Sequence, residues 1–114
     1  MTPSPHVSML MRTLSDPTRR AIFERIARGG ETTVGVLTRA GRVSQPAVSQ
    51  HVKALQDARL IVGRREGRNV FYRADPRGLA PLANWIRYYE QLWAQSFDRL
   101  DDYLQTMQRN ETNS

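Results

Sequence analysis

Apolar residues recur every three or four positions along most of this chain, and every second position along one short stretch. The first spacing predicts amphipathic helices and the second predicts strands. We therefore expect a mostly α-helical protein with one small β-hairpin. The expected helices cover residues 8–14, 17–28, 34–40, 44–60 and a long segment from residue 76 onward, and the expected strands cover 60–66 and 69–74.

The segment 44–60, SQPAVSQHVKALQDARL, is the helix around which the rest of the chain is organised. Ser44 is suited to cap its first turn, because its hydroxyl can accept a free backbone N–H. At about 100° per residue, Val48, Val52 and Leu55 fall together and predict a face packed on a core. The other side carries amide, hydroxyl and ammonium groups without a central acid: Gln45, Ser49, Gln50 and Lys53.

This polar side is chemically suited to reading DNA. Amide side chains can form paired hydrogen bonds with adenine edges, and hydroxyls can reach several bases. A face that binds another protein more often carries an aromatic or aliphatic anchor. The helix by itself leaves one alternative open, an ordinary amphipathic helix with a solvated polar side.

Two shorter helices are expected before it. Asp16 is suited to cap a helix over residues 17–28. A second helix over 34–40, with Thr32 or Thr33 as its cap, is closed by Gly41, and Ser44 follows that glycine three positions later. Two helices joined by so short a turn predict a helix-turn-helix.

The alternating stretches 60–66 and 69–74 flank the pair Gly67-Arg68, which predicts a two-residue hairpin loop. A two-stranded ribbon with a basic tip beside a helix-turn-helix is the wing of a winged helix. Such a tip can rest on the DNA backbone or enter the minor groove, and the alternative is a solvated hairpin whose charges discourage edge pairing. Glu66 is the one acid among the arginines at this tip: Arg64, Arg65, Arg68 and Arg73.

The C-terminal segment carries an apolar seam with an average step of about 3.5 residues, as in a coiled coil. Such a stripe predicts dimerisation against a two-fold related copy. The alternative is that its aromatic part binds an apolar effector or a second protein. The expected dimer interface is Leu82, Trp85, Ile86, Tyr89, Trp93, Phe97, Leu100 and Leu104.

The length of 114 residues fits one domain with an added element. We expect a disordered tail over 1–7, a DNA-binding domain over 8–76, a helical dimerisation segment over 77–109 and a frayed end over 110–114. The net charge is +6, and it is unevenly distributed: residues 1–78 hold 14 basic and 6 acidic side chains, whereas 79–114 hold 3 and 5. The charge suited to a polyanion thus lies in the first part of the chain.

The sequence gives little support to other classes of protein. There is no cysteine, which excludes disulfides and thiolate metal sites. No apolar run approaches the roughly 18–20 residues of a membrane span, and the N-terminus lacks the pattern of a signal peptide, so we expect a cytoplasmic, nucleoid-associated protein. Ser49 and His51 do not face each other on a helix, and Gly35 is followed by Val36 where a phosphate loop has lysine. We expect that the protein is not an enzyme and binds no cofactor.

Three stretches together resemble the ArsR family of bacterial winged-helix repressors: LSDPTRRAIFERIARG (14–29), VSQPAVSQHVKALQDARLI (43–61) and RREGRNVFYRADP (64–76). The resemblance extends over about residues 14–103. It implies a homodimer that binds a partly palindromic double-stranded operator, usually represses its own operon and is released by a signal. It leaves open whether binding represses at every site.

Many members of this family sense metals, but the ligand positions differ here. Where the family motif begins Glu-Leu-Cys-Val-Cys, this chain has ETTVG at 31–35, so Thr33 and Gly35 replace the thiolates. A second family site uses histidine on the C-terminal helix, whereas the only histidines here are His6 and His51. The tail, with RLDDYL at 99–104, looks like a branch without metal ligands, and we expect no metal site.

The resemblance and the chemistry of the side chains together assign roles. His51 is expected to be a half-buried hydrogen-bonding residue. Relatives commonly have glycine at the position of Arg59, where a left-handed residue closes the recognition helix; this conformation strains any other residue by roughly 1 kcal/mol. The expected base readers are Ser44, Gln45, Ser49 and Gln50, and the expected phosphate contacts are Lys53, Arg64, Arg65 and Arg68, with Arg68 the candidate for the minor groove.

Overall fold

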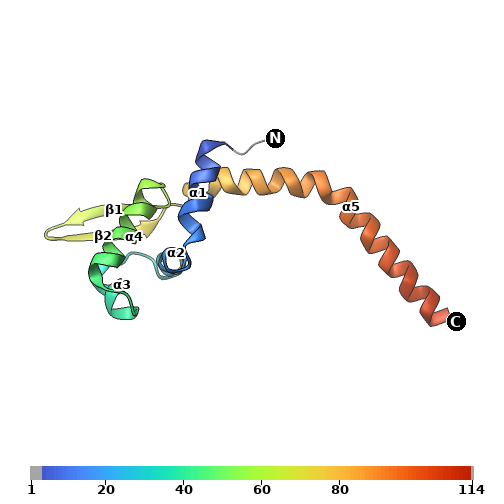
Figure 1. Cartoon of the computed structure of the whole chain (residues 1–114), viewed down its shortest axis with the longest axis horizontal. Coiled ribbons are helices and arrows are strands. Elements are labelled where there is room, and N and C mark those ends of the chain that lie inside the picture. Colours follow the sequence, from blue (N-terminus) through green and yellow to red (C-terminus); the bar gives the residue numbers. More distant parts are fainter. Residues whose placement is uncertain (1–3, 114) are drawn as a thin grey trace. The chain divides into compact units, whose positions relative to one another are not determined.

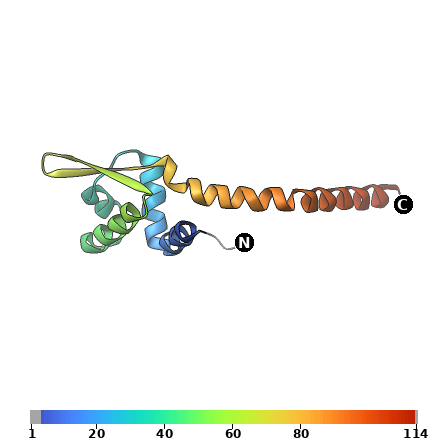
Figure 2. The ribbon, with the colours of Figure 1, turned by 90° about the horizontal axis from the view of Figure 1, so that it is seen from above.

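The computed structural model describes residues 4–113, with side chains over 4–111 (Figures 1 and 2). The chain divides after Leu82 into two compact units, which we describe separately. The fold is mostly helical with one antiparallel hairpin, as the apolar spacing predicts. In chain order the elements are α1 (Pro5–Ser15), α2 (Pro17–Gly29), α3 (Val34–Ala40), α4 (Gln45–Asp57), β1 (Ile61–Glu66), β2 (Asn69–Ala74), the 3₁₀ helix η1 (Pro76–Leu79) and α5 (Ala80–Asn113).

Helix α1 begins earlier than the sequence predicts, and this corrects the expected disordered tail over 1–7. The Ser4 hydroxyl accepts a hydrogen bond from the backbone N–H of Val7 at 3.2 Å, and Pro5 occupies the first turn, where a missing N–H costs nothing. Val7 is buried, so the segment is held by packing as well as by its cap. Residues 1–3 of the expected tail lie outside the described residues.

The caps of the next three helices confirm the predicted starts. Asp16 accepts the N–H of Arg19 at 3.0 Å, and the C-cap of α2, Gly30, has a φ of 76°. Thr33 caps α3, and the hydroxyl of Ser44 accepts the N–H of Ala47 at the start of α4. The helix-turn-helix is formed by α3 and α4, whose ends are separated by residues 41–44.

Every element of the first unit up to β1 contributes to one core. The predicted apolar face of α4 forms its centre, since Val48, Val52 and Leu55 are all buried. The wing and the following segment pack against the same core through partly buried side chains, among them Tyr72 and Leu82. The remaining buried members of the core are Leu10, Ile26, Leu37, Ala58, Leu60 and Ile61.

The wing is an antiparallel hairpin in which Glu66 pairs with Asn69. Gly67 has a φ of 63°, and a positive φ at the first loop position alone is the pattern of a type II′ turn. On the other side of β2, the backbone of Tyr72 exchanges hydrogen bonds with Thr32, at 2.9 and 2.7 Å. The wing is therefore tied by its backbone to the segment that leads into α3.

The C-terminal segment is helical to Asn113, whereas the sequence predicts a frayed end from residue 110. Residue 114 lies outside the described residues. Pro81 falls in the first turn of α5 and does not break it. Across residues 4–113, no helix has the length and apolarity required to span a membrane.

The end of α4 is a Schellman motif with arginine in the usual glycine position. The N–H of Arg59 bonds to Gln56 O and that of Leu60 to Leu55 O, both at 3.0 Å. Leu55 and Leu60 are fully buried, as the hydrophobic contact of this motif requires. Arg59 has a φ of 62°, so it holds the left-handed conformation for which relatives commonly have glycine.

We predict that Arg59→Gly raises the melting temperature by a few degrees, because it removes strain of roughly 1 kcal/mol. DNA affinity should not change. Differential scanning calorimetry measures the first effect and a gel-shift titration the second. A lower melting temperature would contradict the prediction.

Gly78 packs directly on the same helix end. A Cβ at this position would overlap the carbonyl oxygen of Arg59 and lie 3.0 Å from the Cα of Leu60. We predict that Gly78→Ala destabilises the fold by about 1–3 kcal/mol, the range typical of overpacking. The control is Gly29→Ala, because a Cβ at Gly29 meets nothing within 4 Å. Urea denaturation should separate the two variants, and equal stabilities would refute the steric argument.

Candidate nucleic-acid interface

The predicted reading face of α4 is free of the core. Gln45, Ser49, Gln50 and Lys53 are all exposed, while the valines on the other side of the helix are buried. Ser44 is exposed as well, and its oxygen caps the helix. The Ser44 hydroxyl keeps its hydrogen available to donate, because the cap uses it only as an acceptor.

The structure brings the start of this helix and the tip of the wing to one hollow of about 450 Å³. Gln45 from α4 and Arg68 from the hairpin loop both line it, and Val70 and Tyr72 contribute apolar surface. Two predicted DNA-binding residues that are 23 positions apart in the chain thus share one surface.

Arg39 also lines this hollow, and the sequence reasoning did not single it out. It lies in the last turn of α3 and is exposed. A basic residue on the first helix of a helix-turn-helix is a weak signal, because cations are common in last turns, where they interact favourably with the helix dipole. Only the approach of α3 to the wing places this guanidinium beside Gln45 and Arg68.

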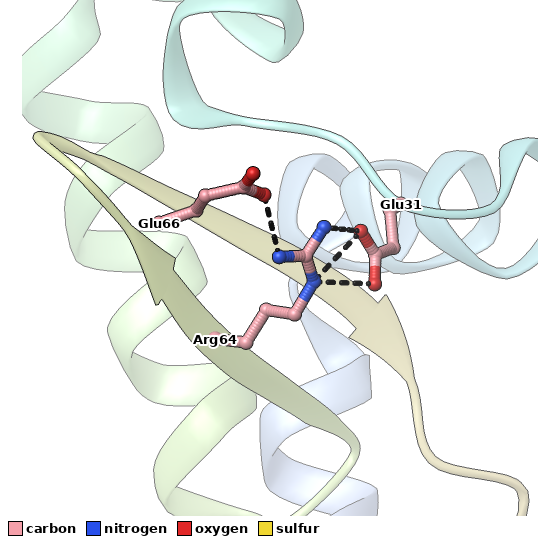
Figure 3. A network of polar contacts seen from close by, with 3 residues as sticks. All are labelled: Glu31, Arg64 and Glu66. Atoms are coloured by element: carbon pink, nitrogen blue, oxygen red, sulfur yellow. Dashed lines mark hydrogen bonds and ion pairs between the residues drawn. The ribbon is translucent and has the colours of Figure 1, made fainter.

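One predicted phosphate contact, Arg64, already has partners in the protein (Figure 3). Its Nε and Nη2 donate to the carboxylate of Glu31 at 2.8–3.2 Å, and its Nη1 donates to Glu66 at 2.7 Å. The guanidinium also lies 5.0 Å from the centre of the Phe71 ring. Within residues 4–113, neither Arg65 nor Arg68 forms an ion pair.

These contacts change the acid–base properties of the groups. Hydrogen bonds from Arg64, followed by its positive charge, lower the pKa of Glu31. The hydrogen bonds to Glu31 and Glu66 raise the pKa of Arg64. Both shifts favour the charged forms, so both groups are charged at neutral pH.

His51 links the reading helix to α2. The Nε of Arg19 donates to His51 Nδ1 at 3.3 Å, and His51 is half-buried, which confirms its expected hydrogen-bonding role. Arg20, the other arginine at this helix start, donates to the carbonyl of Leu14 at 2.8 Å. The N-cap Asp16 has a lowered pKa, chiefly because it accepts the backbone N–H of Arg19.

A second surface lies on α5. Its apolar stripe is largely exposed in the single chain: Phe97 is 57% exposed and Leu100 54%. Leu82, by contrast, packs on the core of the first unit, a contact that the seam did not predict. The aromatic rings form a ladder with centre-to-centre distances of 5.0, 5.6 and 6.5 Å and border a hollow of about 460 Å³: Trp85, Tyr89, Trp93 and Phe97.

The expectation about metals stays a prediction. In the part of the chain that the structure describes, no three His, Asp or Glu residues come together as ligands. Glu31, which begins the stretch matching the family's metal motif, is bound to Arg64.

The helix-turn-helix, its exposed acid-free face and the basic wing define a winged-helix DNA-binding protein. The family described as "Helix-turn-helix domain" matches residues 14–64. The chain is 52% identical over 71 residues to the HTH-type transcriptional regulator Rv2034 of Mycobacterium tuberculosis, covering 62% of this chain and 65% of that protein. It is 31% identical over 77 residues to the transcriptional repressor SdpR of Bacillus subtilis, covering 68% and 84%.

The fold is also that of solved regulators. The crystal structure of an ArsR family transcriptional regulator, RHA00566, superposes with a TM-score of 0.71 at 26% identity, over 82% of this chain and 97% of that one. The chain belongs to the ArsR family of winged helix-turn-helix transcriptional regulators, as its three motif stretches predict.

Proposed function

We propose that this protein is a homodimeric repressor, without catalytic activity, that binds a partly palindromic operator upstream of its own operon and does not sense metal through cysteine. The observation that carries the proposal is the exposed polar face of α4, which shares a basic hollow with the wing tip. The names of relatives support repression: SdpR is a transcriptional repressor, and a Streptomyces lividans relative, 40% identical over 67 residues, is a probable mercury resistance operon repressor.

The side chains divide into two groups by what they can recognise. Hydroxyls and amides on α4 reach base edges in the major groove. Cations neutralise phosphates and carry no sequence information by themselves. The first group is Ser44, Gln45, Ser49 and Gln50; the second is Lys53, Arg65, Arg68 and Arg39, with Arg68 entering the minor groove.

The stripe on α5 supports the dimer. An exposed apolar surface with a step of about 3.5 residues is unfavourable in water and is buried when a second copy covers it. A two-fold dimer would present two copies of α4 to half-sites about one helical turn apart. This geometry explains why a partly palindromic operator is expected.

A footprint on DNA from upstream of the protein's own gene tests the proposal. It is run with a metal chelator, against a scrambled fragment and at two salt concentrations. A protected, roughly symmetric site in the presence of chelator is the expected result. Equal, salt-sensitive binding to both fragments would contradict selection of a sequence by α4 alone.

The aromatic hollow on α5 favours a second candidate function. A pocket lined by aromatic rings, Ile86 and one acid, Glu90, has the character of a small-molecule site. An apolar effector or a partner protein bound there would release the repressor from DNA. Tryptophan fluorescence that shifts with a small molecule but not with dilution would favour this function over a dimer core.

We predict different effects for two substitutions at the shared hollow. Gln45→Ala should relax the preference for the operator over random DNA by about tenfold or more, since a paired contact to a base is lost. Arg68→Ala should weaken binding to both DNAs and lower the salt slope by about 0.9, the value for one phosphate. Fluorescence anisotropy titrations on both DNAs measure these effects. Equal losses in both variants would disprove the division of roles.

We also predict that Leu100→Glu shifts the protein toward monomer. A carboxylate placed in an apolar interface costs enough to raise the dimer dissociation constant by about tenfold or more. Gln95→Glu adds the same charge about 140° away around the helix and should leave the dimer intact. Sedimentation equilibrium compares the two variants, and a dimer that tolerates both would place the interface elsewhere.

A further inference from the structure

The Glu31–Arg64–Glu66 cluster, called here the brace, lies on one particular face of the wing. Arg64 pairs with Phe71 across the ribbon, whereas Arg65 pairs with Val70. Successive residues of a strand point to opposite faces, so Arg64 and Val70 lie on different faces. Val70 lines the hollow shared with the start of α4. Arg64 therefore lies on the face of the ribbon opposite to Val70 and Tyr72, the two strand residues that give the hollow its apolar lining.

The charge of the brace is also wrong for a phosphate. One guanidinium stands against two carboxylates, and all three of its nitrogens donate to them (Figure 3). These bonds use three of the five N–H groups of Arg64, and a phosphate that reached the other two would lie beside both carboxylates. Like charges placed together in this way are unfavourable.

The brace joins two segments that are distant in the chain. Glu31 directly precedes Thr32, whose backbone is bonded to Tyr72 in β2. Arg64 starts on β1, passes over the Phe71 ring of β2 and reaches Glu31 on the far side. The side chain thus spans the whole ribbon and adds a second link to the backbone link between the wing and the entry to α3.

We propose that Arg64 is a positioning residue, not a phosphate contact: with Glu31 and Glu66 it sets the position of the wing relative to the helix-turn-helix. This inference rests on the proposed DNA-binding function. It replaces the phosphate role expected for Arg64 from its place near the hairpin tip. Arg65 and Arg68 keep their roles as phosphate contacts.

The test compares operator affinity and its salt dependence in Arg64→Gln, Glu31→Gln and the double variant. The control for Glu31 is Glu24→Gln, which removes one exposed acid from α2. The control for Arg64 is Arg65→Gln, which removes the neighbouring wing cation. Affinities are measured by anisotropy over a series of salt concentrations.

A positioning role predicts a loss of about fivefold or less in each single variant, as for an exposed ion pair, and no further loss when Glu31→Gln is added to Arg64→Gln. The salt slope should stay at the wild-type value in Arg64→Gln and fall by about 0.9 in Arg65→Gln. The proposal is overturned if Arg64→Gln lowers the slope as Arg65→Gln does. It is also overturned if Glu31→Gln tightens binding more than Glu24→Gln, since that would mean a released Arg64 binds phosphate.

A charge swap tests the same point with the cluster rebuilt. Glu31→Arg combined with Arg64→Glu moves the guanidinium to the other segment, where it faces Glu66 and the carboxylate introduced on β1. Affinity should return to within about twofold of the wild type, well inside the range of one exposed pair. A phosphate contact at position 64 would not be restored by this exchange, and persistent loss would overturn the proposal.

A readout without DNA separates this inference from the proposed function. The amide of Tyr72, bonded to Thr32 O at 2.7 Å, reports on the backbone link beside the brace. Native-state hydrogen exchange should be faster at Tyr72 in Glu31→Gln than in Glu24→Gln. An unchanged exchange rate at Tyr72 would overturn the positioning role of the brace even if the footprint succeeds. A failed footprint with faster exchange would overturn only the proposed operator function.

Discussion

The burial of one face of α4 is the interaction on which the rest of the structure depends. Val48, Val52 and Leu55 stand at the centre of the core, and burying each such side chain contributes about 1.5–3 kcal/mol. The same packing turns the amide and hydroxyl groups of α4 outward. In the proposed function, stability and recognition are therefore coupled through one helix: a substitution that loosened the apolar face would also displace the polar face proposed to read bases. The earlier helices supply the opposite wall of this core and cap their own ends with local hydrogen bonds.

The wing is held in place by contacts of three kinds. The Schellman end of α4 leads through the buried Leu60 directly into β1. The Thr32–Tyr72 backbone bonds tie β2 to the entry of α3. The ion pairs of Arg64 lie beside those bonds. Because the wing tip and the start of α4 share one surface, each of these contacts bears on the distance between Gln45, proposed to read bases, and Arg68, proposed to bind the DNA backbone.

Helix α5 differs from the first unit in where its apolar residues lie. The first unit buries most of its large aliphatic side chains within the single chain, whereas the α5 stripe exposes about half of the surface of Trp93 and Leu104. Exposed apolar stripes of this kind mark interaction sites. The chain thus couples a domain whose core is complete to a helix whose apolar face needs a partner.

The sequence alone determined the features that depend on neighbouring residues. Caps, turn glycines and apolar spacing are local signals, so the bounds of α2, α3 and the hairpin and the start of α4 followed from the residues within and beside them. The predicted end of α4 at Leu60 was wrong by three residues, because the helix ends at Asp57. The tertiary structure alone decided the features that depend on distant residues. The sequence predicts disorder for residues 5–7, but they are helical. Their order depends on the packing of Val7 in the tertiary structure, which neighbouring residues do not reveal. The sequence predicts a phosphate contact for Arg64. Glu66 stands near Arg64 in the chain, but Glu31 is 33 positions away, so the sequence does not reveal that Arg64 has a second acidic partner. Folding brings these two charges together, and the order of charges along the chain does not predict the distance between them.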